Sequence, residues 1–132
     1  MELTFEFKRK DIINANQPIH HMQKANLVKK LRKISKYNCL TIPYKNRPFY
    51  TEKNPCNILI KISPPKKQAY DPPNWSPTGK ALIDGLTDAK IWTDDNFNVV
   101  KYVTYGHGGF SEKKDTYIFK VIVYDYEEFN YD

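Results

Sequence analysis

The chain has 132 residues, of which 40% are hydrophobic and 14% aromatic, and its formal net charge is +6 at pH 7. This length fits a single domain with one modest core, and the abundant tyrosine and phenylalanine exclude a chain that is disordered throughout. No apolar run approaches the roughly 20 residues that a membrane-spanning helix needs, so we expect no membrane partner.

The excess of positive charge favours a nucleic-acid partner, because lysine and arginine release the counterions that surround phosphates. Alternatively, the positive charge serves only to keep the protein soluble, and the composition alone does not decide between this role and nucleic-acid binding. The two cysteines, Cys39 and Cys56, lack the spacing of metal ligands, and no signal peptide precedes them. We therefore expect reduced, structural thiols and a cytoplasmic location.

The first predicted element is a half-buried strand over residues 2–8, in which polar and apolar side chains alternate with period two. A turn over 14–18 leads into a basic amphipathic helix over about 20–36, whose apolar residues fall at helical spacing. The lysine-rich face of this helix is either solvated or lies against phosphates or against a second copy of the helix. The next region, 37–55, is predicted to be irregular, with 41–44 as a candidate short strand.

A run of β-branched residues predicts a buried strand over 57–63, which is followed by a loop rich in proline and lysine. A second helix is predicted over about 77–90, and the segment 98–105 is predicted to be extended. Glycines over 106–109 predict a turn, and an alternation of aromatic and β-branched residues predicts the last strand over 116–125.

The resulting order β-α-β-α-β-β predicts an α+β fold. We expect one small domain over residues 1–132, with a mixed β-sheet and two main helices packed on it. About the last six residues form a candidate flexible tail that is acidic and aromatic.

On the second predicted helix, Lys80, Asp84 and Asp88 fall within one narrow arc, because each is four residues after the last. Apolar residues occupy the opposite arc and are expected to face the sheet: Leu82, Ile83, Leu86 and Ala89. Either Ser76 or Thr78 is expected to cap the amino end of this helix, where free N–H groups favour an acceptor.

Acidic and amide side chains stand before, on and after this helix. Asp71 and Asn74 precede it, and Asp94 and Asp95 follow it after a turn. If these groups meet, their oxygens are the ligands that Mg²⁺ prefers, with waters and a substrate phosphate completing the octahedron. Such a site can hydrolyse phosphodiesters, and Lys80 would add positive charge at the scissile phosphate. The alternative is an ordinary i,i+4 surface ion pair worth about 0.3–0.5 kcal/mol, followed by a polar turn.

Three segments around this helix resemble the central motif of the RusA family of Holliday junction resolvases from phages and prophages: 71–74 (DPPN), 77–89 (PTGKALIDGLTDA) and 92–95 (WTDD). Near the amino end, the segment 14–17 together with His20 is similar to the opening motif of the Gram-positive-type branch of that family. The region from Val99 through the last predicted strand also fits the family, so the resemblance covers most of the chain.

The resemblance implies a RusA-like, homodimeric endonuclease that depends on Mg²⁺, with Mn²⁺ as a substitute. It implies binding to branched DNA at four-way junctions and paired, symmetric cuts, in the cytoplasm of a bacterial or phage-infected host cell. The catalytic residues that it implies are Asp71, Lys80, Asp84 and Asp95. The metal ligands that it implies are Asp71, Asn74, Asp84, Asp94 and Asp95.

Candidate DNA contacts come from two sources. The family's opening motif suggests Asn16, Gln17 and His20. Positive charge suggests lysines on the loop before Asp71 and after the glycine turn, which could steer DNA to the site: Lys61, Lys66, Lys67, Lys113 and Lys114.

Pro73 stands where the family has the second aspartate of its D-x-D-N loop. This departure favours a second hypothesis, a junction-binding protein of the same fold that is catalytically weakened or inactive. A third hypothesis is a phage protein that binds another protein through the aromatic, acidic tail. For Trp75 and Trp92, which bracket the helix, we expect core packing, with stacking on an opened base as the alternative. Gly79 either admits a close neighbour such as DNA or a partner helix, or is tolerated in the first turn.

Overall fold

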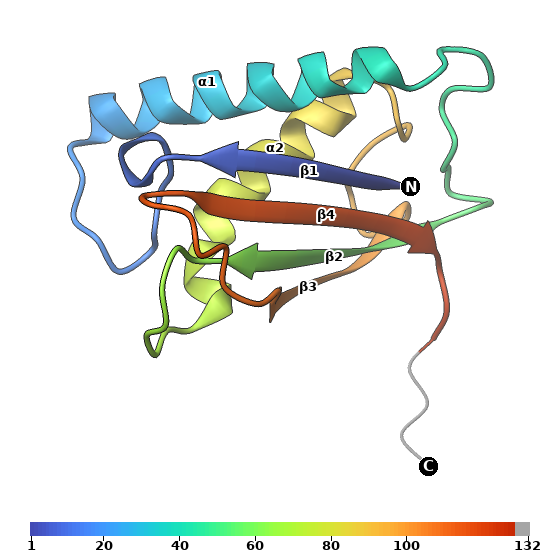
Figure 1. Ribbon diagram of the computed structural model, residues 1–132. Helices are drawn as coiled ribbons and strands as arrows, with labels where there is room; N and C mark the ends of the chain where they lie inside the picture. Colours follow the sequence, from blue (N-terminus) through green and yellow to red (C-terminus); the bar gives the residue numbers. More distant parts are fainter. Residues whose placement is uncertain (129–132) are drawn as a thin grey trace.

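Four strands form one sheet with the order β1-β4-β2-β3 (Figure 1). The computed structural model describes residues 1–128. The strands are β1 (Glu2–Phe7), β2 (Cys56–Ser63), β3 (Val100–His107) and β4 (Tyr117–Asp125). Strand β4 is antiparallel to β1 and to β2, whereas β3 is parallel to β2, so the sheet is mixed.

Two helices, α1 (His21–Asn38) and α2 (Ser76–Asp88), lie on one face of this sheet and leave the other face open (Figure 1). Both begin and end within about two residues of the predicted helices, which is the ordinary uncertainty of helix boundaries. The α+β fold with a mixed sheet and two main helices is therefore confirmed. Neither of the two combines the length and the apolar character that a crossing of the lipid bilayer would require.

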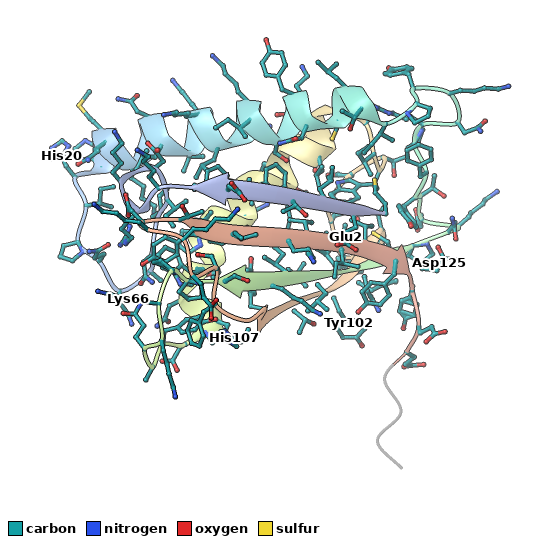
Figure 2. All side chains as sticks on the ribbon, viewed as in Figure 1. Glu2, His20, Lys66, Tyr102, His107 and Asp125 are labelled. Atoms are coloured by element: carbon teal, nitrogen blue, oxygen red, sulfur yellow. The ribbon has the colours of Figure 1, made fainter. Side chains whose placement is uncertain are left out.

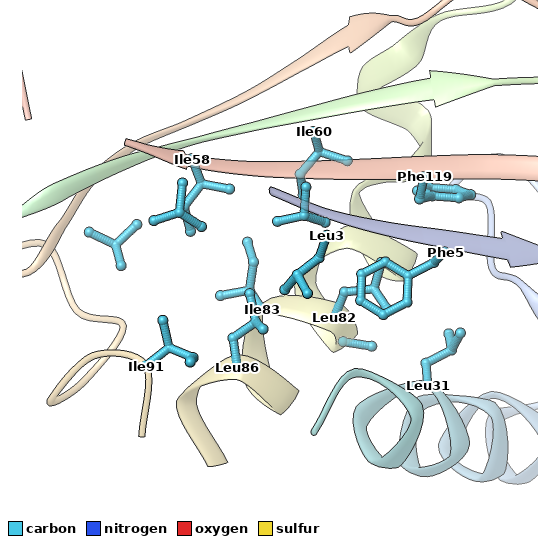
Figure 3. Packing of buried hydrophobic residues seen from close by; sticks show 14 of the residues in the cluster. Leu3, Phe5, Leu31, Ile58, Ile60, Leu82, Ile83, Leu86, Ile91 and Phe119 are labelled. Atoms are coloured by element: carbon cyan, nitrogen blue, oxygen red, sulfur yellow. The ribbon is translucent and has the colours of Figure 1, made fainter. Parts of the chain in front are cut away.

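The core lies between the sheet and the two helices, as Figure 3 shows. In β1 the exposed and buried residues alternate as predicted, so its three apolar side chains face the helices. From α2, Leu82 and Leu86 are completely buried, and they project toward Ile58 and Ile60 of β2. Each side chain of this size contributes about 1.5–3 kcal/mol when it is fully removed from water. The amphipathic pattern of α2 thus sets which of its faces is left for chemistry.

The two helices approach each other closely at Gly85. A Cβ atom built on Gly85 would overlap the backbone oxygen of Arg32 and the side chain of Ser35, both on α1. Ser35 is fully buried, and its Oγ donates a hydrogen bond of 2.6 Å to the carbonyl oxygen of Leu82. The absence of a side chain at Gly85 therefore allows the backbones to meet, and the serine satisfies a buried acceptor there.

One guanidinium group holds the carboxyl ends of both helices. Arg47 donates from Nη1 to the carbonyl oxygen of Ala89 at 2.7 Å and from Nη2 to that of Cys39 at 2.6 Å. Cys39 caps the end of α1 and Ala89 caps the end of α2. A third bond, of 2.7 Å, runs from Nη2 to the carbonyl oxygen of Ile42. Helix carboxyl ends carry unpaired carbonyl groups and a partial negative charge, so a guanidinium group there both donates hydrogen bonds and provides a favourable positive charge.

We expect Arg47→Met to lower the free energy of unfolding by about 2 kcal/mol, because it leaves several partly buried carbonyl oxygens without a donor. Urea denaturation followed by circular dichroism measures this change. Arg32→Met is the matched control, since the Arg32 side chain is 47% exposed and its loss should cost no more than about 1 kcal/mol. Equal losses for the two variants would contradict the special role of Arg47.

Two local predictions are wrong. Residues 41–44 form no strand, because a short 3-10 helix over Cys39–Thr41 follows α1 directly and leaves no room for one. Gly106 and His107 belong to β3 and not to a turn, because they continue the parallel pairing with β2 as far as Ile62 opposite His107. Gly108 and Gly109 follow the strand without forming a turn, although Gly109 has a positive φ of 85°, and the bend and turn of this connection lie at 113–115.

The predicted amino-terminal cap of α2 is also wrong. Neither Ser76 nor Thr78 caps the helix through its side chain. Thr78 is fully buried, and its hydroxyl accepts from the backbone N–H of Ile13 and donates to the carbonyl oxygen of Ile13, both at 2.8 Å. Thr78 therefore ties the amino-terminal segment to α2.

Cys39 and Cys56 are free and buried, in keeping with the expected structural thiols. Burial, with a smaller effect of the Asp125 charge, raises the pKa of the Cys56 thiol to about 12. Of the predicted acidic tail, only its beginning is described, where the backbone oxygen of Glu127 accepts a bond from the Asn57 amide at 3.3 Å. Residues 129–132 lie outside the described residues.

Candidate active site

A lysine on α2 holds two carboxylates at one place. The ammonium nitrogen of Lys80 lies 2.8 Å from Asp84 Oδ1 and 3.4 Å from Asp95 Oδ2. Lys80 and Asp84 are one turn apart on the same helix, as their spacing predicts, whereas Asp95 comes from the loop after α2. Because both oxygens contact the same nitrogen, they lie no farther apart than the sum of these two distances.

The Asp95 carboxylate is connected to the buried core by a chain of hydrogen bonds. Trp92 is completely buried, and its indole N–H donates to Thr87 Oγ1 at 2.7 Å. That hydroxyl lies 3.2 Å from Asp95 Oδ2 and 3.2 Å from the carbonyl oxygen of Ile83. Sequence reasoning missed Thr87 as a site residue. The available signal was Trp92, because a buried indole N–H requires an acceptor and Thr87 is the hydroxyl nearest to it in sequence on the helix.

The charge on Lys80 is secured by its surroundings. The hydrogen bond to Asp84 raises the pKa of the ammonium, burial partly opposes this, and the charges of Asp84 and Asp95 add to the increase. Lys80 is therefore a fixed positive charge at neutral pH and not a base. Beside it, burial raises the pKa of Tyr105 to about 12 although Lys80 acts in the opposite direction, so the phenol remains a neutral donor.

Gly79 admits Tyr105 to the site. A Cβ atom on Gly79 would overlap the hydroxyl end of the Tyr105 side chain, which reaches α2 from β3. The close neighbour that Gly79 admits is therefore a residue of the same chain. Lys80, Asp84 and Tyr105 together line a shallow depression of about 480 Å³, which Lys24 of α1 also borders.

Asp88 does not join Lys80 and Asp84, although the three fall on one helical arc. It accepts hydrogen bonds from Nε and Nη2 of Arg32 on α1, the second at 2.8 Å. These hydrogen bonds lower the pKa of Asp88. The stabilising contribution of the pair is therefore fully present above about pH 4 and is lost as the pH falls through the lowered value.

Asp71 stands apart from the cluster. It lies exposed just before the 3-10 helix Pro72–Trp75, and its carboxylate has no hydrogen-bond or ion-pair partner among residues 1–128. Asn74 is held through its backbone, whose oxygen accepts from Ala15 N–H at 2.7 Å. Of the three carboxylates expected to be catalytic, the structure thus brings together Asp84 and Asp95, and not Asp71.

The carboxylate of Asp94 forms hydrogen bonds within its own loop. Its two carboxylate oxygens accept from the backbone N–H of Asp95 at 2.7 Å and from the amide of Asn96 at 3.1 Å. It orients the start of the loop that carries Asp95, and both oxygens point to neighbours in the chain. As a predicted metal ligand it is therefore placed less favourably than Asp84.

The donor set fits one Mg²⁺ ion held by Asp84 and Asp95. The carboxylates of Asp84 and Asp95 both face the Lys80 ammonium, which occupies the position a metal cation would take. The Lys80 side chain is 65% exposed, whereas those of Asp84 and Asp95 are 22% and 23% exposed. The carboxylates are therefore fixed, whereas the lysine has room to move. Mg²⁺ commonly takes one or two carboxylates and keeps several waters. The described part of the chain contains no set of three His, Cys, Asp or Glu side chains that could hold a metal, so a larger ligand set is not preassembled.

The candidate DNA contacts from the opening motif occupy the loop before α1. Asn16 and Gln17 are exposed there. The ring nitrogen Nδ1 of His20 accepts from the backbone N–H of Met22 at 3.3 Å, so His20 caps α1.

The candidate lysines lie on several surfaces. Lys66 and Lys67 are exposed on the loop that leads to Asp71, and Figure 2 labels Lys66 at the same end of the molecule as His20. Lys61 alternates with buried isoleucines of β2, so its side chain is on the open face of the sheet, away from α2. Lys113 pairs with Glu6 of β1 at 3.1 Å, and its neighbour Lys114 is exposed.

Trp75 and Trp92 are both buried, so core packing is confirmed for them. Trp75 packs against Tyr117 and Phe119 of β4, with ring centroids 5.2 Å and 6.0 Å away. Neither indole is available to stack on a base.

Comparisons with protein-family models and with curated proteins each found no match to this chain. The family resemblance therefore depends on the motif residues themselves.

Proposed function

We propose that this protein is a Mg²⁺-dependent, RusA-like endonuclease that resolves four-way DNA junctions as a homodimer. The observation that supports this most directly is the meeting of Asp84 and Asp95 at the Lys80 ammonium. The two carboxylates that contact this ammonium are metal-ligand groups of the kind that phosphodiester hydrolysis uses. The net charge of +6 favours binding to a phosphate backbone.

Each residue of the cluster has a distinct role in this proposal. Asp84 and Asp95 would hold the ion, which would supply an activated water and neutralise charge on the phosphate. Lys80 stays protonated, and its exposed side chain turns from the carboxylates toward a non-bridging phosphate oxygen, where it stabilises developing negative charge. Thr87, fixed by Trp92, keeps the Asp95 carboxylate from rotating away.

DNA reaches the site through the basic surface. Lys24 lines the same depression as Lys80 and Asp84, and exposed Lys66 and Lys67 lie on the loop before Asp71. Lysines placed in this way attract the backbone without reading sequence, so junction binding should weaken steeply as salt rises.

A synthetic four-way junction tests the proposal. We expect paired, symmetric nicks in Mg²⁺ or Mn²⁺, no nicks in EDTA, and little cleavage of a linear duplex of the same sequence. Gel analysis of end-labelled strands measures the cuts. Failure to cut the junction with either metal would contradict the nuclease assignment.

The second candidate is a junction-binding protein of the same fold without cleavage. Pro73 in the metal-ligand loop and the isolated position of Asp71 favour it. It predicts tight, salt-sensitive binding to the junction and intact strands in the same assay. Absence of preferential junction binding would contradict both candidates.

A further inference from the structure

The two outer strands of the sheet differ in how they are protected. Strand β1 carries Glu2 and Glu6 on its exposed side, and they pair with Lys120 and Lys113. A second copy of β1 placed antiparallel about Thr4 would set Glu2 opposite Glu6 of that copy, which is a like-charge contact. Charged residues of this kind keep sheet edges from pairing.

Strand β3, at the other edge, lacks this protection. It has a neighbour only on its β2 side among the described strands, and residues 101–104 in its middle are all exposed. In Figure 2, Tyr102 and His107 mark this edge, and no described strand lies beyond it. From Tyr102 to Tyr105 the strand has no charged residue and no proline, and Val103 is 41% exposed. An edge of this composition is suited to strand pairing.

We propose that β3 pairs antiparallel with β3 of a second copy of this chain, about a two-fold axis near Val103. With the axis at Val103, that residue faces its own copy, Tyr102 faces Thr104, and Lys101 faces Tyr105. These are β-branched and aromatic contacts without like charges. A second copy is favoured over an unrelated peptide because, in this register, no residue of the strand meets a like charge when the strand pairs with its own copy.

The pairing has a consequence for the candidate site. A two-fold axis perpendicular to a continuous sheet leaves the helices of both copies on the same face. Val103 and Tyr105 line the same depression as Lys80 and Asp84, so the two depressions would lie on either side of the axis and open on one side of the dimer. The interface itself does not depend on the nuclease proposal.

Sedimentation equilibrium and light scattering test the interface without any measurement of cleavage. We expect the wild type to have twice the mass of one chain, and Val103→Glu and Val103→Lys each to raise the dissociation constant on the order of a hundredfold. An equimolar mixture of these two variants should again form dimers, because the charges then attract. Leu40→Glu, at a residue that is 77% exposed on another surface, is the matched control and should remain dimeric.

Disulfide trapping provides a second measurement that does not depend on how the charged variants fold. The native Cys39 and Cys56 are buried, so an introduced thiol is the reactive one. We expect Val103→Cys to form a covalent dimer on mild oxidation, since in this register the two Val103 Cα atoms stand directly opposite each other at disulfide distance. Thr4→Cys on β1 should not. A monomeric wild type, a dimer insensitive to charge at Val103, or cross-linking through Thr4 alone would overturn the proposal.

Discussion

Asp95→Asn should strongly slow junction cleavage while leaving junction binding intact. The substitution keeps the shape of the side chain and its acceptor for Thr87, but removes one of the two negative charges that face the Lys80 ammonium. We expect the cleavage rate in Mg²⁺ to fall on the order of a hundredfold or more, because the cation then has one carboxylate in place of two. Single-turnover cleavage and a gel-shift titration at fixed salt measure the two properties separately.

Asp94→Asn is the matched control, because it makes the same change at the neighbouring residue. Its oxygens accept bonds from Asp95 N–H and from Asn96, and an asparagine retains an acceptor for the first of these. We expect its cleavage rate to stay within about threefold of wild type. Asp71→Asn completes the series and reports whether the isolated carboxylate joins the site on DNA. If wild type and Asp95→Asn cut equally fast, the assignment fails.

Gly85→Ala should be the most destabilising methyl addition in the chain. On an exposed helix this change usually stabilises by up to about 1 kcal/mol. Here the new methyl group would overlap the Arg32 backbone oxygen and Ser35, so α1 and α2 must separate. We expect a net loss of about 3 kcal/mol in the free energy of unfolding, measured by urea denaturation.

The control for Gly85→Ala is Gly79→Ala. There the obstacle is the end of the Tyr105 side chain, which can be shortened by a second substitution. Combining Gly79→Ala with Tyr105→Ala should recover part of the loss from the first change, whereas Ser35→Gly should not rescue Gly85→Ala, since the backbone of Arg32 remains. Full rescue by Ser35→Gly would show that the helices are held by the serine and not by backbone contact.

Features set by neighbouring residues could be predicted from the sequence. The alternation in β1, the apolar stripe of α2 and the Lys80–Asp84 pair all follow from local periodicity, and the structure has them. The position of Asp95 in the cluster does not follow from periodicity, because the loop after α2 has none; the hypothesis that it joins Asp84 rested on its place just after the helix and on the family resemblance.

Features set by distant contacts could not be predicted. Asp88 lies on the same helical arc as Asp84, but it forms hydrogen bonds with Arg32, which is 56 residues away in sequence. Gly106 looks like a turn residue, yet the parallel pairing with β2 extends the strand through it. The role of Arg47 depends on the ends of two helices meeting one loop, which no local pattern contains.

The order of the strands also determines how the molecule reaches its native state. Among the described strands β1 pairs with β4 alone, with Glu2 opposite Ile122, although β2 and β3 lie between them along the chain. Closing so long a loop is entropically expensive before any contact rewards it, and folds dominated by such distant pairings form slowly, on the order of milliseconds to seconds. Until β4 inserts between β1 and β2, the backbone N–H and C=O groups along the edge of the first strand stay unpaired, and an unpaired strand edge favours aggregation of the unfinished chain.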